Sequence, residues 1–99
     1  MHVLVAIHHR VQAWTIPPDH VEALRRRFPA TTFVHSTTRD TDIDLAENAD
    51  VAFALTLSKE AVARAARLKW VHCSGHAVGH FPLAELAARA VTVTNSRGV

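Results

Sequence analysis

Three histidines and one cysteine gather in the segment spanning residues 68–80, LKWVHCSGHAVGH. They are His72, Cys73, His76 and His80. On a helix, histidines four residues apart would share one face, and three imidazoles on one face could hold a zinc ion. Gly75 and Gly79 argue against a helix here, because glycine is a poor helix former. The segment is better interpreted as a strand ending in a loop with polar imidazoles. A proton-transfer or substrate-contact role for one histidine stays open.

Strands and helices alternate along the chain and place this loop at a strand end. Apolar or β-branched runs predict strands at residues 3–7, 31–35, 49–55, 68–73 and 91–94. Helices are predicted over residues 19–28, over 58–67 with Ser58 as N-cap, and after Pro82. Strands joined by helices must be parallel with right-handed crossovers, which predicts an α/β three-layer sandwich. Ligands of such folds bind beyond the carboxyl ends of the strands.

Other residues whose side chains could take part in chemistry have simpler interpretations. His8 and His9 follow the first strand and so share the edge of the 74–80 loop, where solvated histidines are the simplest expectation. Cys73 is expected to be a small buried side chain rather than a nucleophile. Trp70 is expected in the core. Trp14 could lie in the core or cover the strand ends.

The polar segment at residues 36–44 contains alternating aspartates, as a calcium loop does. They are Asp40, Asp42 and Asp44. Glycine at the sixth loop position and glutamate at the twelfth, which such a loop requires, are both missing. The segment is therefore predicted to be a solvated turn, with Asp44 capping a short helical turn through Glu47.

Composition excludes several classes of function. The formal net charge is only +2 and the sole tight basic cluster is residues 25–27, which point in three directions on a helix, so nucleic-acid binding is not expected. The single cysteine cannot form an internal disulfide, which favours a reducing compartment. The apolar run near the N-terminus is too short for a signal peptide or a membrane span. We therefore expect a cytoplasmic protein that does not contact membranes.

Residues 49–99 resemble the amino-terminal part of the D-isomer-specific 2-hydroxyacid dehydrogenases. The resemblance rests on five motifs in a fixed order. They are Ala-Asp-Val at 49–51, Ala-Ala-Arg-Leu-Lys-Trp-Val at 65–71, the small-residue loop at 74–80, Pro-Leu-Ala-Glu-Leu at 82–86 and Val-Thr-Val-Thr-Asn at 91–95. The match covers about half of the chain.

This resemblance implies a flavodoxin-like fold with a five-stranded parallel sheet of order 2-1-3-4-5. It also implies that residues 1–99 are the amino-terminal segment of a substrate-binding domain, incomplete at its carboxyl end. In the family a Rossmann domain that binds NAD or NADP follows, and it is not part of this chain, which has no Gly-x-Gly-x-x-Gly motif. The full enzyme would be a homodimeric oxidoreductase that transfers hydride between nicotinamide and a small 2-hydroxy or 2-keto acid.

The resemblance places substrate binding in the loop after the fourth strand. Its backbone at Ser74, Gly75, His76 and Ala77 would hold the substrate carboxylate. Backbone amides suit this task because they donate charge-assisted hydrogen bonds. No catalytic, cofactor-binding or metal-binding residue is expected in this chain, which alone should be inactive. The alternative is a stand-alone flavodoxin-like module that binds a small ligand or a metal.

Overall fold

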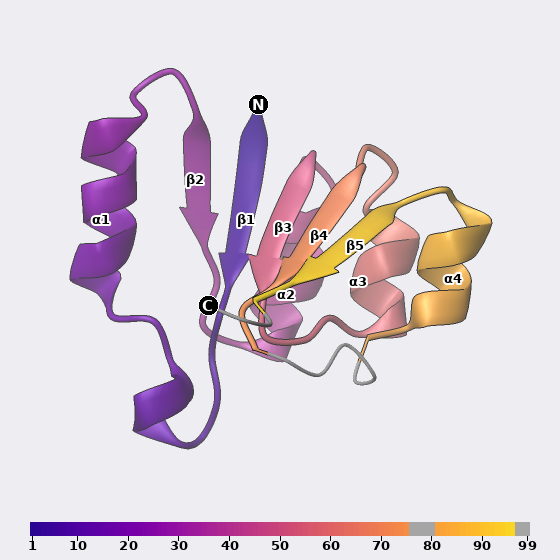
Figure 1. Ribbon diagram of the computed structural model, residues 1–99, viewed down its shortest axis with the longest axis horizontal. Helices are drawn as coiled ribbons and strands as arrows, with labels where there is room; N and C mark the ends of the chain where they lie inside the picture. Colours follow the sequence, from indigo (N-terminus) through magenta and orange to yellow (C-terminus); the bar gives the residue numbers. More distant parts are fainter. Residues whose placement is uncertain (76–80, 97–99) are drawn as a thin grey trace.

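Five parallel strands form a single sheet in the computed structural model, which describes residues 1–75 and 81–96. Their order across the sheet is β2-β1-β3-β4-β5 (Figure 1). The strands are β1 (His2–Ala6), β2 (Thr32–His35), β3 (Val51–Ala54), β4 (Trp70–Cys73) and β5 (Thr92–Asn95). The expected doubly wound order 2-1-3-4-5 is confirmed.

Helices connect the strands on both faces of the sheet and form the outer layers. They are the 3-10 helix η1 (Gln12–Trp14) and the α-helices α1 (Pro18–Arg27), α2 (Arg39–Ala46), α3 (Lys59–Arg64) and α4 (Leu83–Ala88). Figure 1 shows α2 and α3 behind the sheet and α1 beside β2 at the opposite end from α4. The predicted cap is confirmed, since the Ser58 hydroxyl accepts a hydrogen bond from the Ala61 N–H.

Alternating residues of the strands pack into two separate clusters, one on each face. Leu4 and Ala6 of β1 belong to the larger core, which also takes side chains from α2, α3 and α4. Val5 and Ile7 point the other way and pack with Val21 of α1. Strands that bury both faces are typical of doubly wound sheets, as the apolar run at residues 3–7 predicts.

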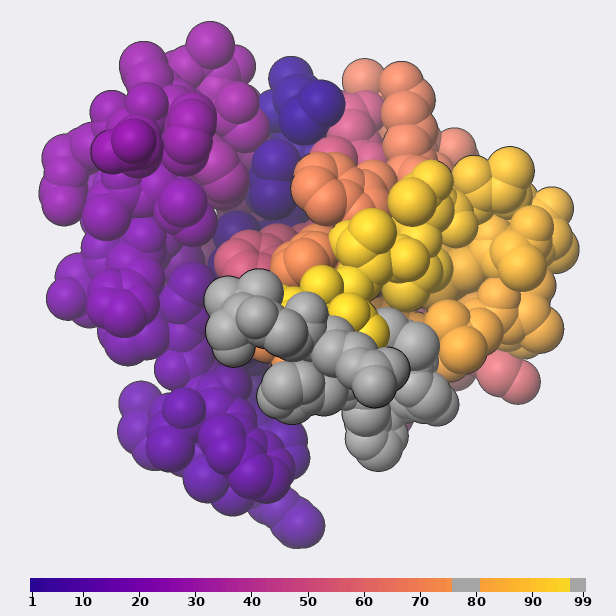
Figure 2. Space-filling view, in the orientation of Figure 1, coloured from indigo at the N-terminus to yellow at the C-terminus, as the bar shows by residue number. Residues whose placement is uncertain are grey.

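The α1 face of the sheet stays partly open over β3, β4 and β5. Figure 2 shows this face, with β3 and β4 visible between α1 and β5. Trp70 lies there with 42% of its surface exposed, whereas the adjacent Val71 is fully buried. The expectation that Trp70 belongs to the core is wrong, because alternation along β4 turns it away from the larger cluster.

The polar segment after β2 forms a helix, which corrects the predicted turn. The Thr38 hydroxyl accepts a hydrogen bond from the Thr41 N–H and caps α2. Asp40 and Asp42 lie in the first turn, where negative charge is favoured by the helix dipole. The short turn predicted from Asp44 is therefore also wrong. The local signal was the N-cap at Thr38, which precedes Asp44 in the sequence and starts the helix earlier.

None of the helices in the described part of the chain is long and apolar enough to cross a membrane.

Candidate functional site

A cavity of about 630 Å³ opens at the carboxyl ends of the strands, on the α1 face. Its walls come from four places in the chain. They are Ile7 after β1, residues 13–17 and His20 from η1 to α1, and Leu55, Ser74 and Gly75 after β3 and β4. The chain leaves β1 toward β2 on one side, while β3 continues the sheet on the other. The cavity therefore lies at the topological switch point, where ligands of doubly wound folds bind.

The outer wall of the cavity is held by the connection between β1 and α1. The Ile16 N–H donates to the Ile7 carbonyl over 2.9 Å, which folds this connection back onto the end of β1. The Thr15 hydroxyl joins it to the backbone of His9, accepting from the N–H at 3.0 Å and donating to the carbonyl at 2.9 Å. The His9 and Trp14 rings pack with centroids 4.6 Å apart. Trp14 was expected either in the core or as a cover over the strand ends. It lines the cavity and is 58% exposed, so it is not a core residue.

The inner wall contains two of the four predicted substrate-binding residues, Ser74 and Gly75. The Ser74 N–H donates to the Ala54 carbonyl at 2.9 Å, so this amide is engaged by the neighbouring strand. The Gly75 carbonyl accepts from the Ser96 N–H at 3.1 Å. Among the described residues, no acceptor is found for the Gly75 amide. The other two predicted residues, at positions 76 and 77, lie outside the described residues.

A chain of hydrogen bonds on the open face braces the start of this loop. Trp70 Nε1 donates to Thr94 Oγ1 at 2.8 Å, and His72 Nδ1 lies 2.7 Å from the same oxygen. His72 Nε2 lies 3.0 Å from Ser96 Oγ, which donates to the Cys73 carbonyl at 3.1 Å. Because the Ser96 hydrogen is used there, His72 Nε2 must be the donor to Ser96. In a neutral ring, Nδ1 then accepts from the Thr94 hydroxyl, and every member is satisfied.

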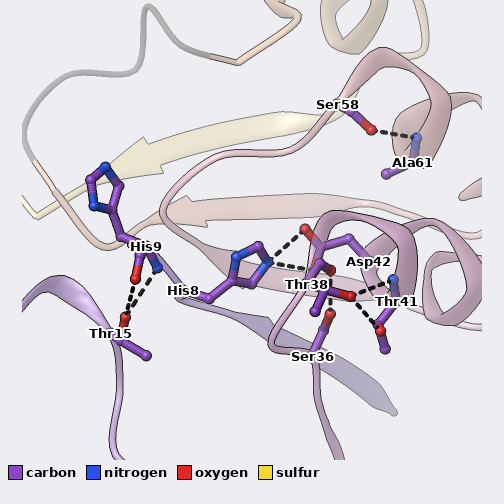
Figure 3. Close-up of polar contacts among 9 residues, drawn as sticks. All are labelled: His8, His9, Thr15, Ser36, Thr38, Thr41, Asp42, Ser58 and Ala61. Carbon is purple, nitrogen blue, oxygen red and sulfur yellow. Dashed lines mark hydrogen bonds and ion pairs between the residues drawn. The ribbon is translucent and has the colours of Figure 1, made fainter. Parts of the chain in front are cut away.

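His8 lies on the opposite face of the sheet and forms a pair with Asp42. His8 Nε2 is 2.9 Å and 3.0 Å from the two carboxylate oxygens of Asp42 (Figure 3). The side chain of Asp42 is only 4% exposed and that of His8 is 18% exposed. The expectations of a solvated aspartate and a solvated histidine are both wrong here, because α2 packs its first turn against the end of β1. His9, by contrast, is exposed.

The His8–Asp42 pair borders a smaller cavity of about 210 Å³, together with Arg39 and Ser58. The pair lies where the residue after β1, the first turn of α2 and the start of α3 come together. Its side chains are absent from the lining of the larger cavity. The sequence signal that could have found Asp42 was its place in the first turn after the Thr38 cap.

Two ionisable groups near the sheet have shifted pKa values. Burial lowers the pKa of His35 below its ordinary value of 6.5, and electrostatic interactions with Arg25 and His8 lower it further. The Nε2 atom of His35 is buried and has no hydrogen-bond partner among the described residues. At the amino ends of β1 and β3, the His2 N–H donates to Asp50 over 2.8 Å and lowers the pKa of this carboxyl below 3.8.

Metal binding gains no geometric support from the described residues, in which no three His, Cys, Asp or Glu side chains gather as metal ligands. Two members of the zinc alternative, at positions 76 and 80, lie outside the described residues. Cys73 is buried at 1% exposure within the larger core, in line with its expected role as a packing residue.

Known structures share this fold across the whole chain. The NAD-dependent formate dehydrogenase of Staphylococcus aureus, in complex with NAD, matches with a TM-score of 0.76 at 15% identity, covering 99% of this chain and 33% of that one. A D-lactate dehydrogenase of Treponema pallidum matches with a TM-score of 0.71 at 14% identity, covering 96% and 29%. A protein of Thermus thermophilus matches with a TM-score of 0.71 at 24% identity, covering 99% and 31%.

The chain therefore has the doubly wound fold of a part of these proteins and spans about a third of their length. No model of a protein family matches the sequence, and no curated protein does so either.

Proposed function

We propose that residues 1–99 are the amino-terminal segment of the substrate-binding domain of a D-isomer-specific 2-hydroxyacid dehydrogenase. The observation that carries the proposal is the cavity at the β1/β3 switch point, whose inner wall includes the predicted loop residues Ser74 and Gly75. The fold shared with a formate dehydrogenase and a D-lactate dehydrogenase supports it. So does the order of motifs in residues 49–95.

In this proposal the loop that begins at Ser74 holds the carboxylate of a small 2-hydroxy or 2-keto acid. The Ser74 amide is engaged with Ala54, whereas the Gly75 amide and the Ser74 hydroxyl have no partner among the described residues and are the donors proposed at this end of the loop. The family resemblance assigns the rest of the cradle to positions 76 and 77, which lie outside the described residues. Such donors stabilise an anion without changing their own protonation. The His72 chain holds the Cys73 carbonyl and thereby positions the strand end from which the loop departs.

The cofactor of the proposed enzyme is NAD or NADP, which accepts or supplies the hydride. Residues 1–99 do not fit a dinucleotide, because the first strand is followed by His8 and His9 rather than by a glycine-rich turn. The cofactor and the residues that transfer protons would therefore belong to another part of a cytoplasmic, homodimeric enzyme. The 99-residue chain alone should not catalyse the reaction.

The test begins with the source protein that contains this sequence. We expect its intact mass to correspond to about three times this chain, as in the structural relatives. We expect it to oxidise NADH or NADPH in the presence of a 2-keto acid, while the purified chain of residues 1–99 does not. Failure of the source protein to reduce any 2-keto acid with either cofactor would contradict the proposal.

One observation favours a second candidate, a stand-alone module that binds a small ligand. The lining residues of the cavity come from several segments of this one 99-residue chain. A mature product of 99 residues that binds a small carboxylic acid but reduces no 2-keto acid would establish it. Equilibrium dialysis against zinc tests the metal-binding form of this candidate, and absence of stoichiometric binding would exclude that form.

A further inference from the structure

The described walls of the switch-point cavity are mainly apolar on the side away from Ser74 and Gly75. The floor consists of Ile7, which is 8% exposed, and the partly buried Leu55. The outer wall consists of the apolar Ala13, Trp14, Ile16 and Pro17, together with His20 and with Thr15. The Thr15 hydroxyl already bonds the backbone of His9. Among the described lining residues, His20 is the only ionisable side chain, and it is exposed. We infer that the substrate acid carries an uncharged, apolar side chain that is branched or aromatic, an inference that rests on the proposed function.

The order of the strands sets the length of the molecule that fits. Ser74 and Gly75 follow β4, Leu55 follows β3 and Ile7 follows β1, and these strands are neighbours in that order. Adjacent strands lie about 4.8 Å apart, so roughly 10 Å separates the inner wall from the end of β1. A carboxylate held at the inner wall therefore directs its side chain across Leu55 toward Ile7 and Trp14. A methyl group is too short to reach them.

The charge of the walls sets the chemistry of the side chain. A second carboxylate or a phosphate at the far end would lie against Ile7, Leu55 and Ile16. An anion buried without a partner is strongly disfavoured, and the described lining offers no lysine or arginine to compensate it. An apolar side chain gains affinity there, by about fourfold for each buried methylene.

The preference is tested by steady-state kinetics of the source enzyme with a panel of 2-keto acids. The panel comprises pyruvate, 4-methyl-2-oxopentanoate, phenylpyruvate and 2-oxoglutarate. We expect kcat/KM for the branched or the aromatic acid to exceed that for pyruvate and for 2-oxoglutarate by at least tenfold. Comparable or higher kcat/KM for pyruvate or 2-oxoglutarate would overturn the inference and leave the proposed function standing. No reduction of any acid would overturn both.

Variants of Leu55 locate the preference in the cavity. Leu55→Ala should lower kcat/KM for 4-methyl-2-oxopentanoate about tenfold, mainly through KM, and change that for pyruvate less than threefold. Leu55→Met conserves apolar volume and should keep the preference, which preserves the test if the alanine variant folds poorly. Leu83→Ala is the matched control, because Leu83 is 41% exposed on α4 and lines no part of this cavity. Equal losses for all acids in Leu55→Ala would contradict the inference.

Discussion

His8 Nε2 lies 2.9 Å from Oδ2 and 3.0 Å from Oδ1 of Asp42, a carboxylate whose side chain is 4% exposed. The two residues are 34 positions apart in the sequence. Their contact joins the residue after β1 to the first turn of α2. It therefore holds α2 against the carboxyl end of β1, on the face of the sheet opposite the larger cavity. The histidine acts here as the partner that makes a buried carboxylate tolerable.

Removal of the Asp42 charge should therefore destabilise the fold. We expect Asp42→Asn to lower the free energy of unfolding by about 1–3 kcal/mol, because the amide cannot reproduce a charge-assisted bond with both oxygens. Asp44→Asn is the control, since Asp44 is exposed in the same helix and should change stability by no more than about 0.5 kcal/mol. Urea denaturation measures both variants. Equal effects of the two substitutions would show that the His8 contact contributes nothing.

The hydrogen-bond chain through His72 predicts a particular tautomer. The neutral ring should carry its proton on Nε2 and accept at Nδ1 from Thr94, as the donation of Ser96 to Cys73 requires. Nitrogen chemical shifts of the imidazole, measured by NMR above the pKa of an ordinary histidine, report the tautomer directly. A ring protonated on Nδ1 would contradict the assigned direction of the chain.

Removal of one hydroxyl from the hydrogen-bond chain through His72 should lower the free energy of unfolding modestly. Thr94→Val removes the hydroxyl that serves both Trp70 and His72, and should destabilise the fold by about 1–2 kcal/mol. Thr92→Val is the matched control, because Thr92 is exposed on the same face of the same strand. The comparison uses the difference between the two unfolding free energies. A difference below about 0.5 kcal/mol would argue against the bracing role.

Asp50 predicts a loss of stability in acid. The His2 N–H holds the pKa of this carboxyl below 3.8, so the unfolded state binds its proton more readily than the folded state does. The stabilisation is therefore present above pH 3.8 and is lost as pH falls through the lowered pKa. In Asp50→Asn this part of the acid dependence should disappear, whereas Asp19→Asn, at an exposed position, should retain it. Parallel pH profiles for wild type and Asp50→Asn would contradict the prediction.

His35 predicts a second pH dependence nearer neutrality. Burial, Arg25 and His8 lower its pKa below 6.5, so the folded state resists protonation that the unfolded chain accepts. Stability should therefore be complete above about pH 6.5 and decrease as pH falls through the lowered pKa. Substitution His35→Phe removes this dependence, together with a buried Nε2 atom that has no partner in the described part of the chain. His20→Phe is the exposed control, and thermal unfolding between pH 5 and 8 compares them. An unchanged pH slope in His35→Phe would refute the assignment.

Local patterns predicted most of the fold. Apolar or β-branched runs located all five strands to within a few residues. The central strands need continuous apolar sequence because both of their faces are covered, and the outer strands β2 and β5 are rich in β-branched residues, which favour strands. The Ser58 cap and Pro82 placed the starts of two helices for reasons confined to a single turn. Alternation of strands and helices then required a parallel sheet. The helix α2 within residues 36–44 was not predicted, because the polar residues of this segment suit a turn as well as the exposed side of a helix.

What only the tertiary structure decided is which distant residues meet. The sequence by itself determined that Ser74 and Gly75 follow a strand end, and that His8 follows another. It did not determine that η1 would wall the cavity with Trp14, that Asp42 would be buried beneath His8, or that Trp70 would face outward. These outcomes depend on how helices and connections pack against the two faces of the sheet. Propensity and periodicity act over a few residues, whereas such packing joins residues that are far apart in the chain.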